Sequence, residues 1–566
     1  MIVYGDQRET IHTSSFFGEL NRRRDHLSEM RSGISRHAEL VGLHVEAGRL
    51  AQGVADAAFD PERGDGPTAN NEPLMEWLTA SGRCILRSWT NGFGFEPPPP
   101  FPKLRELPER VTLTIPEGYA FHALHPESYI EAALSLPHRG ASVRVIGVRS
   151  IGTSLASLVA AVLDSPAPIT VRPTAHPFSR EVHLREPALR KLLDGAEHFV
   201  VVDEGPGLSG SSFAAVGRLM RGRGVRADRI TFMPGHGNGP GVEACEETRR
   251  IWAGTTVRPA VQIPDSRIAD WIADLLGESL IGVEDLSAGH WRAKLFADPS
   301  QWPPIDPRTD RRKLLVRTAT GAYFARFVGL GLSGERKLDR ARRLEQAGFI
   351  PEVLGVVNGF LVQQWIEPAY SRPSDPMELG QYLRARLSLP APGLAGASID
   401  VLREMALANT AESLGEQAAG RLGRKLKGGE FLRQEIEPVA IDGACQPWKW
   451  FRNEQGRIFK ADALDHDGDH DLVGPQPIVW DLVGACIELG YDRGAMENLN
   501  EIVLPGNLRP RLELFLFMEA CYLAFRVGAT RMAARALAGD LDERRRIESA
   551  EASYRKRLEL LCFADE

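Results

Sequence analysis

The sequence predicts an α/β fold with a doubly wound parallel sheet, carrying an N-terminal helical cap and followed by an α+β unit of two lobes. Short apolar runs alternate with helical patterns over residues 103–265, which is the order of a parallel sheet with crossover helices. Apolar residues recur at helical spacing through much of residues 1–102. Residues 266–566 contain a strand-rich stretch and then long helical patterns.

Length and composition indicate a multidomain globular protein. The chain has 566 residues, and its hydrophobic and charged fractions of 43% and 25% are ordinary for globular proteins. A net charge of -7 argues against nucleic acid or an anionic membrane as the main partner. The six cysteines lack Cys-x-x-Cys spacing, and no apolar run approaches the ~20 residues that span a bilayer. We expect a cytoplasmic protein that acts on small molecules.

Four segments follow one another along the chain. We predict a helical cap with a Pro-rich linker over residues 1–102 and the parallel-sheet domain over residues 103–265. A linker helix and a small lobe follow over residues 266–370, and a helical large lobe over residues 371–566. Strands are expected at 111–115, 143–146, 169–172, 199–202 and 229–233, and a hairpin with an Asn-Gly turn at 355–366.

One stretch carries the clearest chemical pattern. The apolar run 199–202 is typical of a strand buried on both faces. Asp203 and Glu204 follow it directly, at the end of a strand where open α/β sheets bind ligands. The small-residue loop 205–212 then opens a helix, whose N–H groups suit a phosphate. The pattern indicates a site for a phosphorylated polyol, and the alternative is a buried strand before a serine-capped helix.

This stretch resembles the phosphoribosyl-diphosphate (PRPP) motif of the type I phosphoribosyltransferases. The resemblance implies that Asp203 and Glu204 hold the ribose hydroxyls. The phosphate ligands that it implies are Ser209, Gly210, Ser211 and Ser212. Glu204 stands where an aspartate is usual, and Gly205-Pro206 replaces two apolar residues. The family implies PRPP as the substrate, Mg²⁺ as the cofactor, and displacement at the anomeric carbon of the ribose.

A second Gly/Ser turn, residues 147–154, follows the strand predicted at 143–146. In the same family a loop one βα unit before the motif binds pyrophosphate, and this turn stands at that place. The resemblance implies that Arg149 pairs bidentately with a diphosphate. The implied pyrophosphate residues are Arg149, Ser150, Ile151, Gly152 and Thr153, with Arg172 and Arg180 from the basic stretch that follows. The alternative for each basic residue is a solvated position in a loop.

Residues 280–566 resemble the protein-kinase-like fold of the aminoglycoside and choline phosphotransferases. The resemblance rests on a β-rich small lobe, one helix, a hinge and a helical large lobe. The family has a lysine on its third strand, paired with a glutamate of the helix. Arg326 occupies that strand here, with Glu335 or Glu345 as its partner, so the resemblance implies nucleotide binding by Arg326 and Glu335.

Three aspartates of the large lobe stand where that family places functional acids. Asp442 takes the place of the catalytic-loop aspartate, although the usual His-Gly-Asp and the following Asn are absent. Asp462 takes the place of the metal aspartate, and Asp481 resembles a later structural aspartate. Asp465 is a second Mg²⁺ candidate, in an acidic patch at 462–471 that departs from the EF-hand pattern. Phosphoryl transfer needs such acids, a cation on the phosphates and, by this resemblance, ATP.

These features predict a phosphoribosyltransferase-type enzyme fused to a phosphotransferase-like domain. Two other interpretations stay open at this point. One is a regulatory protein that senses a nucleotide or PRPP without catalysis. The other is a small-molecule kinase whose first domain only binds substrate.

Overall fold

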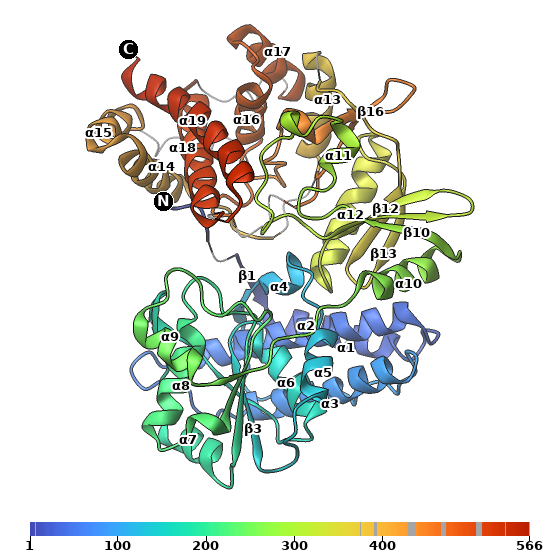
Figure 1. Cartoon of the computed structure of the whole chain (residues 1–566), viewed down its shortest axis with the longest axis vertical. Helices are drawn as coiled ribbons and strands as arrows, with labels where there is room; N and C mark the ends of the chain where they lie inside the picture. Colours follow the sequence, from blue (N-terminus) through green and yellow to red (C-terminus); the bar gives the residue numbers. More distant parts are fainter. Residues whose placement is uncertain are drawn as a thin grey trace.

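The protein is a mixed α/β structure in which the two halves of the chain form two bodies that lie against each other (Figure 1). The computed structural model describes residues 1–564 except 6, 374, 390–392, 428–436, 466–470, 505–511 and 538. One five-stranded sheet of the described chain is parallel, and another five-stranded sheet is antiparallel.

The parallel sheet lies in the first half and has the strand order β4-β3-β7-β8-β9. Its strands are β3 (Val143–Val148), β4 (Ile169–Val171), β7 (His198–Val202), β8 (Ile230–Met233) and β9 (Thr256–Val257). The helices between them are α6 (Gly152–Val162), α7 (Glu186–Leu193), α8 (Ser211–Gly222) and α9 (Glu246–Ala253). Val143 and Val145 join one apolar cluster, whereas Ile146 and Val148 join another. The sheet is therefore buried on both faces, as its apolar runs predicted.

Residues 111–115 form the predicted strand, but this strand lies outside the parallel sheet. As β2 (Arg110–Thr114) it pairs antiparallel with β1 (Arg8–His12). Its sequence alternates apolar residues with threonine, and the burial of its side chains alternates as well. Such alternation is typical of an antiparallel strand with one covered face, which explains why β2 lies outside the parallel sheet. The helical cap consists of α1 (Thr13–His26), α2 (Ile34–Ala57) and α3 (Asn71–Thr90).

The second half begins with a small lobe built on the antiparallel sheet. The strand order is β10-β11-β12-β14-β13. The strands are β10 (Leu280–Asp285), β11 (Lys313–Thr318), β12 (Ala322–Phe327), β13 (Val353–Val357) and β14 (Phe360–Gln364). Asn358 and Gly359, with φ angles of 39° and 85°, make the tight turn of the predicted hairpin. Helix α12 (Leu332–Gln346) crosses between β12 and β13.

The large lobe is mainly helical. Its helices are α13 (Pro376–Leu387), α14 (Ile399–Leu414), α15 (Glu416–Lys425), α16 (Val479–Leu489), α17 (Arg493–Val503), α18 (Leu512–Ala536) and α19 (Leu541–Phe563). A small sheet holds β15 (Ala369–Tyr370), β16 (Trp450–Arg452) and β17 (Ile458–Lys460). The N-terminus lies beside α14, where Asn409 Nδ2 donates to Ile2 O at 2.9 Å (Figure 1).

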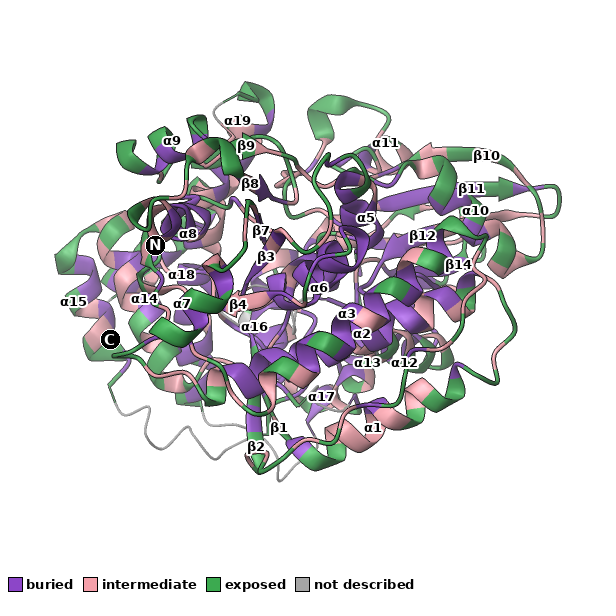
Figure 2. Cartoon of the chain, turned by 90° about the horizontal axis from the view of Figure 1, so that it is seen from below, coloured by how far each residue is buried: buried purple, intermediate pink, exposed green. Residues whose placement is uncertain are grey.

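The two bodies share one apolar core. Leu43 of α2, Trp271 of α10 (Asp265–Leu276), Val316 of β11 and Phe327 of β12 belong to a single buried cluster. Helices α2 and α6 are buried along most of their length (Figure 2). This core crosses the predicted boundaries near residues 102 and 265, and the division into four segments stays a prediction.

The described helices include none with the length and apolar content needed to cross a membrane. The cytoplasmic location stays a prediction.

Candidate functional sites

The predicted acid pair lies at the carboxyl end of β7. Asp203 Oδ1 accepts a hydrogen bond from the Glu204 N–H at 2.9 Å, and Tyr129 Oη donates to Asp203 O at 2.8 Å. Glu204 Oε2 accepts from the Gly118 N–H at 2.9 Å. Burial raises the pKa of the Asp203 carboxyl to about 7. Asp203 therefore changes its charge near neutral pH.

The loop after the acid pair turns sharply into α8. Gly210 has a φ of 64°, and a Cβ there would lie 2.6 Å from Pro240 Cβ, so this position requires glycine. The hydroxyls of Ser209 and Ser211 donate to Pro177 O at 3.2 and 2.8 Å. Pro177 lies in the turn between β5 (Thr174–His176) and β6 (Ser179–Glu181). The carbonyl oxygen of Pro177 thus accepts from the Ser209 and Ser211 hydroxyls that were predicted to bind phosphate, while Ser212, in the first turn of α8, is half-buried.

The predicted pyrophosphate turn is adjacent to this loop because β3 and β7 are neighbouring parallel strands. A Cβ at Gly152 would lie 2.6 Å from Val202 O, which shows how closely the two strand ends approach. Helix α6 begins at Gly152, so the main chain of residues 150–153 forms its first turn. Ser150, Ile151 and Thr153 contribute to this turn through their backbone.

Arg149 and Arg172 are held by two acids of the cap. Arg149 Nε donates to Asp56 Oδ1 at 2.8 Å, and its Nη2 pairs with Asp65. Arg172 Nε donates to the same Asp56 oxygen at 2.8 Å. The Arg149 side chain is only 1% exposed. Arg180, on β6, donates to Ala175 O at 2.9 Å. The predicted pyrophosphate arginines therefore have protein partners that a diphosphate would have to replace.

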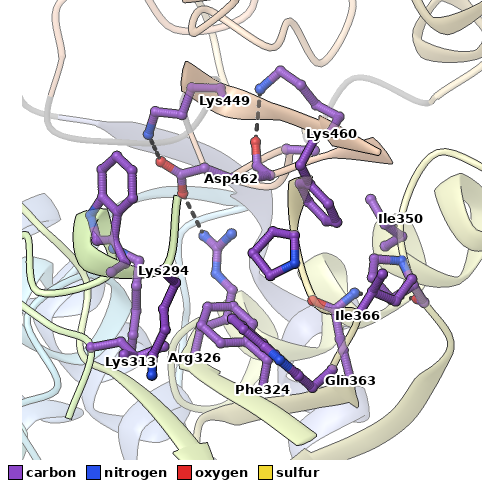
Figure 3. Close-up of a pocket in the computed structure, with 18 of the residues that line it drawn as sticks. Lys294, Lys313, Phe324, Arg326, Ile350, Gln363, Ile366, Lys449, Lys460 and Asp462 are labelled. Carbon is purple, nitrogen blue, oxygen red and sulfur yellow. Dashed lines mark hydrogen bonds and ion pairs between the residues drawn. The ribbon is translucent and has the colours of Figure 1, made fainter. Parts of the chain in front are cut away.

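A second site lies in the cleft between the small and large lobes. A cavity of about 130 Å³ is bounded by β12, β14, β16 and the residues after β17. Phe324, Ile350 and Ile366 form apolar walls, and Arg326, Lys313 and Lys449 add cations (Figure 3). An apolar cavity with a cationic side suits a nucleotide, which combines a flat base with charged phosphates.

Arg326 lies in this cavity and contacts two aspartates. Its Nη2 is 3.1 Å from Asp462 Oδ1, and it also pairs with Asp465. Lys449 reaches Asp462 from the other side (Figure 3). Asp462 has a φ of 57°, a backbone conformation that non-glycine residues seldom adopt and that clusters at functional sites.

The predicted contact between Arg326 and Glu335 is wrong. Glu335 lies on another face of α12 and pairs with Arg23 of α1, with Arg23 Nη1 2.6 Å from Glu335 Oε1. Lys337 lies on the face of α12 that meets Asp465 instead, with its Nζ 2.8 Å from Asp465 Oδ1. Positions 335 and 337 lie about 200° apart around a helix, because each residue turns it by about 100°. The family resemblance implies a glutamate on this helix, so no signal in the sequence pointed to Lys337.

Asp442 is buried, and its carboxylate lies 3.1 Å from Lys460 Nζ and accepts a hydrogen bond from Tyr382 Oη. Asp481 Oδ2 and Oδ1 accept from the Asp442 and Gly443 N–H groups at 2.7 and 2.8 Å. Burial, followed by the charge of Asp442, raises the pKa of Asp481 to about 6. Asp481 thus fixes the turn at Asp442, which is the structural role that its sequence context suggested.

A larger cavity, of about 280 Å³, adjoins the first. The two cavities share Trp291, Trp448, Lys449 and Asp462 as wall residues. The larger one is also lined by Tyr4, by His122 of the first half, and by residues of α18 and α19. Trp291 comes from the segment between β10 and β11, which gave no clear pattern in the sequence. Gly443 lines this cavity, next to the buried Asp442.

The two Mg²⁺ candidates differ in their surroundings. Asp465 is 2% exposed and is enclosed by Arg326 and Lys337, so its prediction as a metal ligand is corrected. Within the described residues, no three His, Cys, Asp or Glu side chains gather where they could hold a metal ion. Mg²⁺ in kinases needs one or two carboxylates together with substrate phosphates. Asp462 lines both cavities and its side chain is 15% exposed, so a metal could reach it once its pairs with Arg326 and Lys449 open. Residues 466–470 of the acidic patch lie outside the described residues.

No family model matches the sequence, and no curated protein matches it. The solved structures include the choline kinase LicA from Streptococcus pneumoniae, which is 15% identical, with a TM-score of 0.33 over 51% of this chain and 99% of that chain. The spectinomycin phosphotransferase APH(9)-Ia, in complex with ADP and spectinomycin, is 14% identical, with a TM-score of 0.36 over 53% of this chain and 97% of that chain. A choline/ethanolamine kinase family protein from Mesorhizobium loti is 18% identical, with a TM-score of 0.32 over 48% of this chain and 93% of that chain. These structural neighbours, each over about half of the chain, are kinases of the choline and aminoglycoside phosphotransferase type.

Proposed function

We propose that the second half of the chain is a small-molecule phosphotransferase that uses a nucleoside triphosphate such as ATP. The observation that supports this proposal is the position of Asp462, in the wall between cavities of about 130 and 280 Å³. A nucleotide in the smaller cavity and an acceptor in the larger one would meet at this carboxylate. Transfer of a phosphoryl group depends mainly on such positioning and on charge stabilisation.

Each wall residue has a role in this proposal. Phe324 and Ile350 contact the base, while Arg326 and Lys449 neutralise the phosphates. Asp462 would hold Mg²⁺, which would offset the charge on the transferred group. Asp442 has buried partners, so we assign it the positioning of the turn that carries Gly443 rather than contact with substrate.

Thermal unfolding with Mg-ATP tests this proposal. A ligand at 100 times its Kd stabilises the folded state by about 2.7 kcal/mol, which appears as a higher Tm. Phe324→Trp fills the smaller cavity and should abolish the shift. Leu354→Trp, at an exposed position of β13 outside both cavities, should retain it. An unchanged Tm of the wild-type protein, or an equal shift in Phe324→Trp, contradicts the proposal.

We propose for the first half a phosphoribosyltransferase-like, doubly wound domain that binds PRPP or a related ribose 5-phosphate compound. The proposal is supported by the adjacent ends of β3 and β7, which bring Asp203 and Glu204 next to the turn at 150–153. The acid pair would orient the ribose during displacement at its anomeric carbon. Stabilisation by PRPP and ribose 5-phosphate that disappears in Asp203→Ala tests it, and an equal shift in both proteins contradicts it.

One observation favours ligand binding without catalysis by this half. The arginines predicted to hold pyrophosphate, Arg149 and Arg172, are paired with Asp56. In that case the first half is a sensor of PRPP or a substrate-binding module of the kinase. Turnover assays separate the interpretations, because an active transferase consumes PRPP with an acceptor, whereas a sensor or module leaves PRPP intact and changes the use of ATP.

A further inference from the structure

A short bridging segment, residues 118–121, contacts both candidate sites. At its first end the Gly118 N–H donates to Glu204 Oε2 at 2.9 Å. A Cβ at Gly118 would lie 2.8 Å from Leu124 Cδ2 and 2.9 Å from Glu204 Cδ, so a larger residue would displace both side chains. Tyr119 Oη is within hydrogen-bond distance, 3.0 Å, of Ser154 Oγ in the first turns of α6. The predicted ribose-phosphate site therefore fixes this end of the segment.

The other end of the bridging segment holds two cations of the second half. Phe121 O accepts from Arg311 Nη1 at 2.8 Å, and Ala120 O accepts from Lys337 Nζ at 3.3 Å. Arg311 Cζ and Lys337 Nζ also lie 4.9 and 5.1 Å from the centre of the Phe121 ring. Desolvated cations are attracted to an aromatic face at such distances. Phe121, Arg311 and Lys337 are all buried.

The contacts continue from these cations to the cleft. Lys337 pairs with Asp465, Asp465 pairs with Arg326, and Arg326 Nη2 lies 3.1 Å from Asp462 Oδ1. Each member is buried or nearly so. Removing one partner from a buried charge is costly, so the groups shift together rather than one at a time. Polar contacts at both ends, joined by the main chain of residues 118–120, thus connect Glu204 to Asp462.

We propose that the bridging segment couples the two sites, so that a ribose 5-phosphate ligand at Glu204 changes the affinity of the cleft for a nucleotide. This inference rests on the proposed functions of both halves. A sugar hydroxyl bound to Glu204 competes with the Gly118 N–H, and the resulting displacement reaches Lys337 and Arg311. Phe121 is then a positioning residue of the phosphotransferase site, supplied by the other half of the chain. Such coupling is reciprocal.

Titration calorimetry of the full chain tests the coupling. The Kd of Mg-ATP is measured with and without saturating ribose 5-phosphate, and the Kd of ribose 5-phosphate with and without Mg-ATP. We expect a change of at least about fivefold, equal in both orders. Phe121→Leu keeps an apolar side chain but removes the ring, and Gly118→Ala displaces Glu204. Both variants should bring the factor close to one, and their Tm values verify folding.

Arg23→Gln is the matched control. It breaks the Arg23–Glu335 pair, which also joins the two halves but lies outside the series of contacts, so its coupling should equal that of the wild type. Unchanged Kd values in the wild-type protein overturn the coupling and leave both proposed sites intact. If Arg23→Gln loses the coupling as the two segment variants do, the coupling does not depend on the bridging segment in particular, and that assignment is overturned. Failure of either ligand to bind alone overturns the corresponding proposed function and the coupling with it.

Discussion

Lys337 Nζ of α12 lies 2.8 Å from Asp465 Oδ1, so the helix supplies a cation beside this buried carboxylate, where an acid was predicted. Asp465 also pairs with Arg326, and Arg311 Nε is 4.0 Å away. Three cations therefore share one buried carboxylate. Of these cations, Arg326 lines the smaller cavity and Arg311 the larger one.

Asp465→Asn should destabilise the fold strongly. The substitution leaves Arg326 and Lys337 without their common buried anion, which costs about 3–5 kcal/mol for a broken buried pair. Denaturant unfolding measures this loss. Asp462→Asn is the control, because its side chain is 15% exposed and borders the cavities. Equal losses of stability in the two variants contradict the structural role of Asp465.

Lys460→Met should also destabilise the protein, since it removes the buried cation that lies 3.1 Å from the Asp442 carboxylate. We expect a loss of about 3–5 kcal/mol in the free energy of unfolding. Adding Asp442→Asn removes the negative charge that has lost its cation, and it should recover part of that loss. A double variant no more stable than Lys460→Met shows that the ion pair is not the main interaction of Lys460.

Ribose 5-phosphate binding should strengthen as Asp203 ionises. Burial raises the pKa of the Asp203 carboxyl from 3.8 to about 7. The contribution of Asp203 to the stability of the fold is therefore complete below pH 3.8 and is lost as the pH rises through about 7. Only the ionised carboxylate accepts from hydroxyls with both oxygens. Calorimetry between about pH 5 and pH 8 compares the wild-type protein with Asp203→Asn, which removes this titration but retains that of the ligand phosphate. Equal pH profiles of the two proteins contradict the assignment.

Gly210→Ala should damage the loop before α8 more than Gly207→Ala. Both glycines have positive φ angles, 64° and 61°, so alanine costs about 1–2 kcal/mol at either position. A Cβ at Gly210 would also lie 2.7 Å from Trp252 Nε1, whereas no atom lies within 4 Å of one at Gly207. We expect a larger loss of Tm in Gly210→Ala than in Gly207→Ala, and weaker ribose 5-phosphate binding in Gly210→Ala alone. Equal effects on both measurements would show that the contact with Trp252 is unimportant.

The sequence predicted elements whose pattern is local. The buried strands β3 and β7 are continuous apolar runs, and the hairpin turn at Asn358-Gly359 has a specific chemistry. The pairing of β1 with β2 joins residues about 100 positions apart and has no local signal. β10 is an edge strand with every second residue exposed, and it was missed.

In the candidate sites too, features with a local sequence pattern were predicted, whereas contacts between distant residues were not. The positions of Asp203, Glu204 and Gly210 were predicted because these residues follow an apolar strand. In the structure they lie between the end of β7 and the start of α8. Which face of α12 meets the cleft depends on tertiary packing, so Lys337 was not foreseen. Likewise, sequence alone did not reveal that Asp56 and Asp65 hold Arg149, because these acids lie in the cap, more than 80 residues away.

The transfer of the γ-phosphate from labelled ATP most directly tests the central claim that Asp462 stands between a nucleotide and its acceptor. Water serves as the acceptor until the substrate is known, and phosphate release is measured with Mg-ATP. Asp462→Asn should reduce the rate by at least about 100-fold, because it removes the carboxylate that would hold Mg²⁺ at the transferred group. Asp339→Asn, at an exposed position of α12, should leave the rate unchanged. Wild-type release that Asp462→Asn does not alter, or no release by the wild-type protein, would contradict the account.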